Sequence, residues 1–152
     1  MPGFVRKNLC VCVGLFLGVI LAGCTTQQLP PDSECPQPRF TGKAPDDYYV
    51  RKNPLQSSEQ DIAAAERLYR GGPKLSCATC HGDSGNGKGP MSGQFDPPPR
   101  NFACAETVNG IPDGQLFWII RYGSPGTAMP PHPGFSDAQI WQLVLYLRRL
   151  AR

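Results

Sequence analysis

The sequence predicts an all-α fold of three to four short helices joined by long loops. Three segments carry apolar residues at helical spacing, and no segment shows a convincing strand pattern. Glycine and proline contribute 17 residues each in a chain of 152, so much of the chain is expected to be irregular. Charged residues make up only 18%, which argues against a long coiled coil, a helical bundle or a nucleic-acid-binding domain.

Residues 1–23 have the pattern of an export signal. Arg6 and Lys7 precede an apolar run of thirteen residues, which is shorter than the roughly 20 residues that span a bilayer. The run ends in Leu-Ala-Gly-Cys, which resembles the lipobox of bacterial lipoprotein signals and whose cysteine is Cys24. The resemblance implies cleavage before Cys24 and a diacylglycerol on its sulfur. An uncleaved anchor helix and a soluble secreted protein are the alternatives.

The lipobox resemblance implies a membrane-anchored lipoprotein on the periplasmic side of the cell envelope. Thr25 stands where an aspartate would resemble an inner-membrane retention signal, so the outer membrane is favoured. Removal of the signal also removes two basic residues and leaves 13 basic against 12 acidic ones, a net charge of +1. That charge gives no reason to expect a nucleic-acid partner.

Residues 24–57 are predicted to form a lipidated tether, and residues 58–152 the folded domain. The tether contains six prolines and almost no apolar periodicity, so extended or polyproline segments are expected. The first helix of the domain is capped by Ser57 or Ser58 and ends at Gly71. Its apolar face comprises Ile62, Ala65 and Tyr69.

Two further helices are expected in the second half of the domain. Residues 113–122 contain an apolar face, and Asp113 is predicted to cap this helix. Ser136 and Gln139 form a capping-box pattern that opens a helix to about residue 150. The long segments between the three helices are rich in glycine and proline, so they are expected to wrap around a bound group.

The pattern Cys-x-x-Cys-His at residues 77–81 is the strongest chemical signal in the chain. Two thiols at this spacing can each add to one vinyl group of a haem, and His81 then lies beneath the iron. A covalent haem also suits a small apolar core, because loops can pack against it. A zinc site would need further ligands, and a thioredoxin-like pair would need a βαβ unit. Cys77, Cys80 and His81 are therefore predicted to attach one haem c.

The order of motifs resembles class I c-type cytochromes, in particular the bacterial monohaem kind. The order is a helix, C-x-x-C-H-G, G-x-G-x-G-P, P-x-R-N-F, a short helix, G-T-A-M-P and a final amphipathic helix, and it covers residues 58–152. The resemblance implies a cytochrome c fold, in which the first and last helices cross near the haem. Tyr69 and Tyr146 match the aromatic positions of that crossing, and Ala65 stands where the family commonly has glycine.

Met129 is the predicted second axial ligand. It lies in Gly-Thr-Ala-Met-Pro-Pro, residues 126–131, whose prolines exclude a helix and which matches the Met-Pro position of the family. A buried methionine that only fills space is the alternative reading of this position. His132 and Met91 are the other candidate ligands, and His132 would have to reach past two prolines.

The family pattern also implies contacts around the haem. The carbonyl group of Pro90 is expected to accept a hydrogen bond from His81 and so fix the orientation of the ring. Arg100 and Asn101 resemble residues that contact a haem propionate, with a solvated turn as the alternative. Trp118 is expected to pack in the core rather than bind a propionate. Three cations could either surround the exposed haem edge or be merely solvated: Lys74, Lys88 and Arg121.

Cys35 and Cys104 are the cysteines left over in the mature chain. In an oxidising compartment two spare thiols are expected to pair. The disulfide would close a loop of 70 residues, which is worth about 4 kcal/mol in the chain-entropy model. It would fasten part of the proline-rich segment to the domain.

These observations together predict single-electron transfer and not catalysis. Histidine and methionine saturate the iron and raise its reduction potential, so no small-molecule substrate is expected. The expected partners are redox proteins at the same membrane. One alternative is a fixed cytochrome c subunit of a larger membrane oxidoreductase complex. The other is a haem enzyme or sensor with a displaceable distal ligand.

Overall fold

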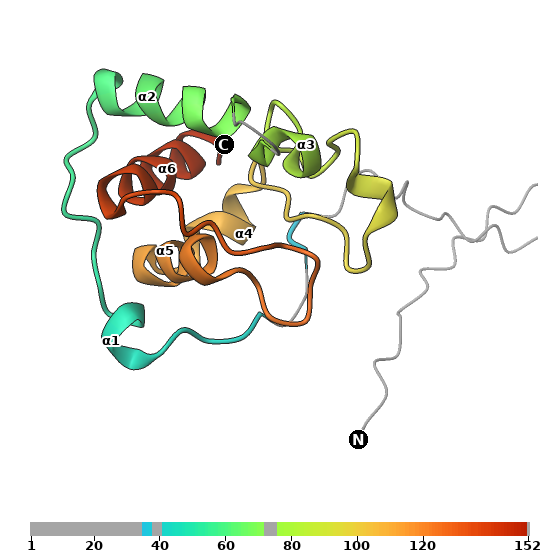
Figure 1. Ribbon diagram of the computed structural model, residues 1–152, viewed down its shortest axis with the longest axis horizontal. Coiled ribbons are helices and arrows are strands. Elements are labelled where there is room, and N and C mark those ends of the chain that lie inside the picture. The colour runs from blue at the N-terminus through green and yellow to red at the C-terminus, as the bar shows by residue number, and fades with distance from the viewer. Residues whose placement is uncertain (1–34, 38–40, 72–75, 152) are drawn as a thin grey trace, which may run out of the picture. The chain divides into compact units, whose positions relative to one another are not determined.

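Helices occupy all three segments that the apolar spacing predicts, as the computed structural model shows (Figure 1). The structure describes residues 35–37, 41–71 and 76–151, and no β-strand occurs among them, which confirms the all-α fold. The elements are α1 (Asp46–Tyr49), α2 (Glu59–Arg70), α3 (Cys77–His81), the 3₁₀ helix η2 (Ser92–Gln94), α4 (Ala105–Asn109), α5 (Asp113–Tyr122) and α6 (Asp137–Leu150). The short elements α1, α3 and α4 add to the three longer helices that the sequence predicts.

Serine caps fix the N-termini of the two longest helices, α2 and α6. The Ser58 hydroxyl accepts a hydrogen bond from the Asp61 amide at 3.1 Å, which makes Ser58 the cap of α2. At α6 the Gln139 amide donates to the Ser136 hydroxyl at 3.2 Å, and the Ser136 amide donates to the Gln139 side-chain oxygen at 2.8 Å. The predicted capping box is thus confirmed.

Helix α5 does not use its predicted cap. Pro112 occupies the cap position, and Asp113 is the first helical residue. The Asp113 carboxylate accepts hydrogen bonds from the Asn53 amide at 3.3 Å and from the Arg148 guanidinium at 2.7 Å. The prediction of a capping role for Asp113 is therefore wrong, because its carboxylate accepts hydrogen bonds from Asn53 and Arg148 instead of from the first amides of α5. Asp113 instead joins α5 to α6 and to the chain that precedes α2.

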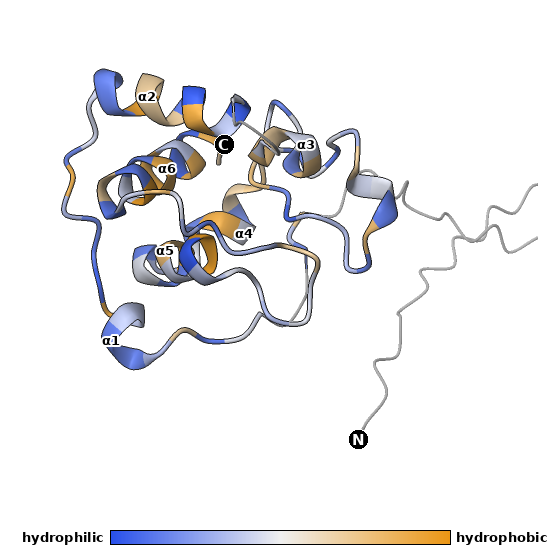
Figure 2. Cartoon of the chain, viewed as in Figure 1, coloured by the Kyte–Doolittle hydropathy of each residue, from blue (hydrophilic) through white to orange (hydrophobic). Residues whose placement is uncertain are grey.

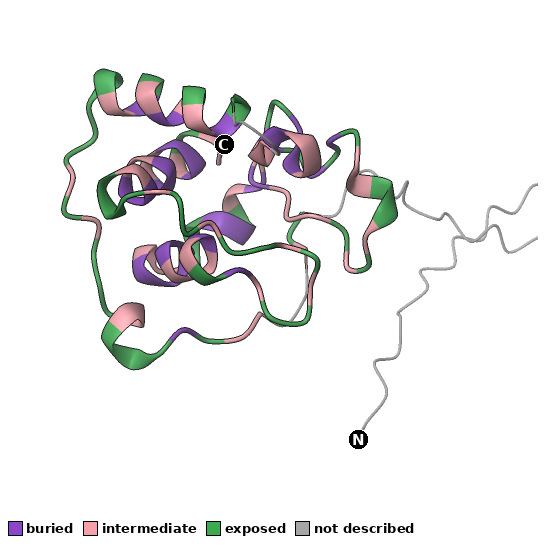
Figure 3. Cartoon of the chain, viewed as in Figure 1, coloured by how far each residue is buried: buried purple, intermediate pink, exposed green. Residues whose placement is uncertain are grey.

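Helix α6 lies between α2 and α5 and contacts both (Figure 1). Hydrophobic residues are concentrated on α4, α5 and α6 in Figure 2, and Figure 3 shows buried residues along the same helices. Where α2 meets α6, the rings of Tyr69 and Tyr146 lie 5.2 Å apart and Ala65 is fully buried. This is the aromatic contact that the sequence predicts for the crossing of the first and last helices.

Residues 35–37 and 41–57, here called the N-terminal strap, belong to the folded unit. The compact unit begins at Cys35 and runs to Arg152. The boundary expected at residue 58 is corrected accordingly. The segment is extended for much of its length, as its prolines predict, but it packs on the domain from Cys35 onward instead of forming a free tether.

Side chains of α5 hold the middle of the N-terminal strap. The Ala44 amide donates to the side-chain oxygen of Gln115 at 2.7 Å, and the Gln115 side-chain NH₂ donates to the Gly42 carbonyl at 2.9 Å. The ring of Tyr48 stacks on Phe117 with centroids 6.2 Å apart. The Tyr48 ring also lies 5.7 Å from that of Tyr122, so the strap is attached through individual polar groups and through the aromatic contacts of Tyr48.

A disulfide between Cys35 and Cys104 fastens the beginning of the N-terminal strap to the start of α4. The predicted pairing is thereby confirmed. Cys104 is buried, with 3% of its surface exposed, whereas Cys35 is exposed, so the bond joins an exposed end of the strap to the buried start of α4.

Several predictions concern residues outside the described part of the chain. The export signal, Cys24, Thr25 and Lys74 all lie there. Among the described residues, no helix has both the length and the apolar character required to cross a membrane.

Candidate functional site

A cavity of about 750 Å³ opens between the helices and loops of the folded unit. Its walls come from helices α2 to α6, from segments 95–102 and 110–112, from the loop between α5 and α6, and from the N-terminal strap. The apolar lining includes Phe102, Leu116, Ile119, Ile120, Leu143 and Leu147. Pockets of roughly 300–1,000 Å³ with mainly apolar walls typically bind cofactors and other large ligands.

Helix α3 brings the residues of the Cys-x-x-Cys-His motif to one wall of the cavity. Ser76 caps this short helix by accepting a hydrogen bond from the Thr79 amide at 3.3 Å. Cys77, Cys80 and His81 all line the cavity, and neither cysteine is in a disulfide. Burial raises the pKa of the Cys77 thiol to about 11, so this thiol is neutral at pH 7.

Two glycines of the loop after α3 allow the backbone to pass close to its neighbours. At Gly89 a Cβ atom would lie 2.3 Å from the Thr79 carbonyl oxygen of α3. At Gly87, where φ is +77°, a Cβ atom would lie 2.8 Å from the Pro99 carbonyl oxygen. Only glycine fits such approaches and such a φ value without strain. The loop therefore packs both on α3 and on the chain near residue 100.

The His81 ring is held from two sides. It is 8% exposed and stacks on Phe102 with ring centroids 4.4 Å apart. Its Nδ1 atom lies 3.0 Å from the Arg100 carbonyl oxygen, and because that oxygen can only accept, Nδ1 carries the proton. Nε2 then has the lone pair that a metal ligand needs.

The predicted acceptor for His81, the carbonyl of Pro90, is corrected to that of Arg100. Pro90 is exposed and is not part of the cavity wall. The segment after the proline run, and not residue 90, supplies the oxygen beside the ring. The kind of contact is as predicted, but its position depends on the path of a long loop.

The loop between α5 and α6 places Met129 on the same cavity as His81. At Gly123, where φ is +82°, a Cβ atom would lie 2.8 Å from the Met129 carbonyl oxygen. The Thr127 hydroxyl donates to the Ser124 carbonyl at 2.8 Å and accepts from the Met129 amide at 3.2 Å. These bonds form a tight non-helical turn around Met129, and its role as an axial ligand stays a prediction.

Arg100 and Asn101, the predicted propionate contacts, have other partners. Arg100 lines the cavity, but its guanidinium donates to the Gln37 carbonyl at 3.0 Å and to the Thr41 hydroxyl at 2.9 Å. Asn101 is not part of the cavity wall, and its side-chain oxygen accepts from the Ala103 amide at 3.0 Å. Its side-chain oxygen is thus used in a turn, and the propionate contact of Asn101 stays a prediction.

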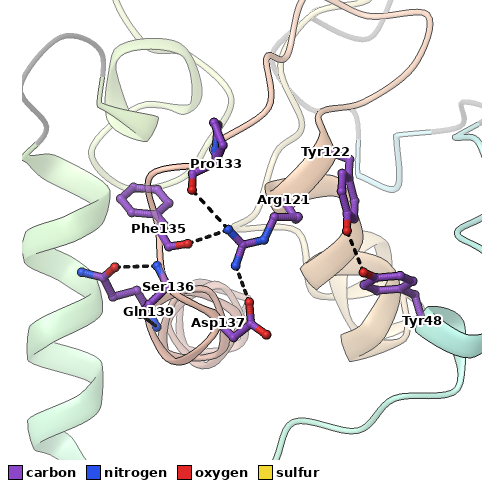
Figure 4. Close-up of polar contacts among 8 residues, drawn as sticks. All are labelled: Tyr48, Arg121, Tyr122, Pro133, Phe135, Ser136, Asp137 and Gln139. Atoms are coloured by element: carbon purple, nitrogen blue, oxygen red, sulfur yellow. Dashed lines mark hydrogen bonds and ion pairs between the residues drawn. The ribbon is translucent and has the colours of Figure 1, made fainter.

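Arg121 is neither a merely solvated cation nor part of the cavity wall. Its guanidinium donates to the Phe135 carbonyl at 2.6 Å and to the Pro133 carbonyl at 3.5 Å, and it pairs with Asp137 (Figure 4). Arg121 thus holds the end of the Met129 loop and the start of α6 against α5.

The remaining predicted candidates divide between the cavity and its surroundings. His132 lines the cavity, stacks on Phe135, and has its pKa lowered by burial. Trp118 is half-buried beside the ring of Tyr122, as expected for packing, and is not part of the cavity wall. Lys88 and Met91 are also absent from that wall.

The sequence reasoning missed the part of the cavity wall that the N-terminal strap supplies. The missed lining residues are Pro36, Gln37, Thr41, Lys43 and Tyr49. One signal for them was available: a disulfide between Cys35 and Cys104 requires the residues next to Cys35 to lie beside α4.

The fold and the site together define a c-type cytochrome domain: α-helices and long loops enclose an apolar cavity with a Cys-x-x-Cys-His motif on its wall. A model of the family described as cytochrome c oxidase, cbb3-type, subunit III matches residues 60–147, which is more than half of the chain, and the chain belongs to this family.

One solved structure with a similar chain is the reducing HAO-like protein complex of Kuenenia stuttgartiensis. The similarity has a TM-score of 0.56 and 29% sequence identity, and it covers 65% of this chain and 47% of that chain. This chain thus matches about half the length of that relative. No curated protein is similar enough to count as a match.

The residues on the cavity wall fit haem c, which is the cofactor of this chain. Cys77 and Cys80 would supply the two thiols for thioether bonds, Nε2 of His81 carries the lone pair that a metal ligand needs, and apolar side chains enclose the space. When bound, haem c supplies an iron that gains or loses one electron. Such an iron is suited to haem-based electron transfer.

Proposed function

We propose that this chain is a monohaem electron carrier with His81 and Met129 as axial ligands, anchored at the cell envelope by a lipid on Cys24. The observation that carries the proposal is that His81 and Met129 line one cavity and that the His81 Nδ1–H is already bound to the Arg100 carbonyl. An imidazole and a thioether saturate the iron and favour its ferrous state. A saturated site supports electron transfer and disfavours catalysis.

Rigid surroundings support this role, because electron transfer is slowed by rearrangement around the redox centre. The His81 ring is fixed by stacking on Phe102 and by one hydrogen bond. The Met129 turn is fixed by the Thr127 hydroxyl. In the proposal, these residues exclude water and orient the two ligands, and they take no chemical part in the transfer.

A fixed subunit of a larger oxidoreductase complex is the second candidate. The family description names a subunit of an oxidase, and the similar solved chain belongs to a protein complex. In that role the chain would relay electrons between subunits instead of diffusing between partners. Purification of the tagged full chain after mild detergent extraction distinguishes these two roles. A fixed subunit should copurify with other redox proteins in constant proportion, and a diffusing carrier should not.

The ligand assignment is tested by absorption spectra of the purified haem-loaded protein in both redox states. We expect a c-type ferrous spectrum and, in the ferric state, the weak red band of a thioether bound to iron. Met129→Ala should abolish that band, whereas Met91→Ala should keep it, because Met91 does not line the cavity. If the band survives in Met129→Ala, or if the wild-type ferrous protein binds CO at once, the saturated His81/Met129 site is refuted.

The anchor is tested by cell fractionation and mass spectrometry of the full chain and of Cys24→Ala. Wild-type protein should be found in the membrane fraction with a mass increased by acyl chains. The Cys24→Ala variant should lose both properties while its haem content is unchanged, because Cys24 precedes the folded unit. An unmodified wild-type cysteine would refute the lipid anchor but leave the electron-transfer function untouched.

A further inference from the structure

The strongest unexplained feature of the site is the connection between His81 and the N-terminal strap. Arg100 has contacts at both ends: its carbonyl oxygen accepts from His81 Nδ1, and its guanidinium donates to Gln37 and Thr41 of the strap. The backbone group that orients the histidine therefore belongs to the residue whose side chain holds the strap.

Gln37 adds two further bonds to the same region. Its side-chain oxygen accepts from the Asn101 amide at 2.8 Å, so the strap grips the chain on both sides of the Arg100 carbonyl group. Its own amide donates to the Thr107 hydroxyl at 3.1 Å, and that hydroxyl contacts the Cys104 sulfur at 3.2 Å. These contacts lie directly beside the disulfide that begins the strap.

The segment that carries the acceptor oxygen needs such support. Residues 97–104 contain no helix or strand, and the backbone bonds there, from the Phe102 and Ala103 amides to the Gly85 carbonyl, hold the chain only from two residues beyond Arg100. On one side this segment packs closely on Gly87, where a Cβ atom would lie 2.8 Å from the Pro99 carbonyl oxygen. On the side of the strap, Gln37 and Thr41 hold the Arg100 side chain and the Asn101 amide. A change in the strap is therefore transmitted to the carbonyl oxygen beside His81.

We propose that the N-terminal strap is a positioning element for His81: through Arg100, its residues Gln37 and Thr41 set the strength of the Nδ1–H hydrogen bond and thereby the electron donation from His81 to the iron. The proposal rests on the proposed function, in which His81 is an axial ligand. A strong Nδ1–H bond makes the imidazole a more basic ligand. A more basic ligand favours the ferric state, so a weakened bond raises the reduction potential.

The experiment compares haem-loaded wild-type protein with Thr41→Val, Gln37→Leu and Thr41→Ser. The Thr41→Val variant keeps the shape of the side chain but removes the acceptor for the Arg100 guanidinium. The Gln37→Leu variant removes the acceptor for the Asn101 amide, and Thr41→Ser keeps the hydroxyl group. Two quantities are measured: the reduction potential, and the solvent-exchange rate of the His81 Nδ1 proton in the ferrous protein by NMR.

The first two variants should raise the equilibrium constant for reduction about threefold, which is about 28 mV at 59 mV per tenfold change. They should also exchange the Nδ1 proton faster, and Thr41→Ser should behave as wild type. The matched control is Asn53→Ala, which removes a bond of 2.9 Å from the far end of the strap to the Trp141 carbonyl. This variant should lose stability but keep the wild-type potential and exchange rate.

Unchanged potential and exchange in both Thr41→Val and Gln37→Leu would overturn the inference. So would an equal shift in Asn53→Ala, which would indicate general loosening, or a raised potential with normal exchange, which would indicate altered polarity at the cavity wall. A wild-type protein without covalent haem would refute the proposed function itself. If the wild-type protein carries covalent haem but the strap variants change neither the reduction potential nor the exchange rate, only the positioning role is refuted.

Discussion

The two regions that enclose the cavity are held in different ways. The α2–α6 crossing is joined mainly by apolar packing, with Tyr69 against Tyr146 over a fully buried Ala65. The N-terminal strap is joined by a disulfide and by hydrogen bonds to separate residues, such as those of Gln115. Apolar packing is distributed over many atoms, whereas each contact of the strap can be lost alone. The crossing should therefore be stabilised by its buried side chains, whereas the strap should owe its stabilising effect to the disulfide and its fine positioning to the hydrogen bonds.

The largest expected effect on stability comes from removing the disulfide that fastens the strap to α4. Replacing Cys35 and Cys104 together by alanine should lower the free energy of unfolding by about 4 kcal/mol, because the disulfide closes a long loop in the unfolded chain. Denaturant unfolding of the haem-loaded protein, monitored by circular dichroism, measures the loss. A midpoint equal to that of wild type would contradict the assignment of this stability to the strap.

A smaller effect on the free energy of unfolding is expected when one side chain of the helical core, and one at the surface of the strap, are each replaced by alanine. Ile140 in α6 is fully buried, so Ile140→Ala should cost about 3 kcal/mol. Val50 in the strap is 72% exposed, so Val50→Ala should change stability by less than about 0.5 kcal/mol. The same unfolding measurement checks both variants. Equal losses in the two would show that the strap packs as tightly as the core.

The smallest effect concerns a polar contact at the helical crossing itself. The Ser58 hydroxyl and the Gln142 side chain donate to the Asp61 carboxylate and hold its pKa below the ordinary value of 3.8. Since the folded pKa is lowered, this stabilisation is present above the ordinary pKa and is lost as the pH falls through the folded value. The effect is small because Asp61 is only partly buried and water screens its charge.

The measurement is the unfolding midpoint of wild type, Asp61→Asn and Gln142→Ala as a function of pH. Asp61→Asn should lack the part of the acid-induced loss that belongs to this carboxylate, and Gln142→Ala should show a reduced part of it. Parallel pH profiles of wild type and Asp61→Asn would rule out a lowered pKa at this position.

The sequence allowed much of the fold to be predicted, because long amphipathic helices leave a periodic pattern. Helices α2, α5 and α6 follow from apolar spacing and from the Ser136–Gln139 capping box. Helices α1, α3 and α4 have four or five residues each, which is too short for a period to be recognised. The Cys-x-x-Cys-His motif was predictable because its chemistry requires a fixed spacing.

The missed features all depend on partners that are distant in the sequence. Asp113 resembles a cap, but Asn53 and Arg148 occupy its carboxylate. The acceptor for His81 is the Arg100 carbonyl because of the path of the loop that follows the proline run. No local pattern encodes such a path. Composition alone predicts that the N-terminal strap is extended, and it does not predict what the strap touches.

The position of the disulfide has a mechanical consequence for this chain. Cys35 is the first residue of the folded unit, and it is bonded covalently to Cys104. A pulling force along the preceding chain therefore passes into the buried start of α4 through the disulfide. The hydrogen bonds of Gln37 and Thr41 lie inside the covalently closed loop, so such a force does not peel them away one after another. The surroundings of His81 are thus shielded from tension applied at the N-terminal side.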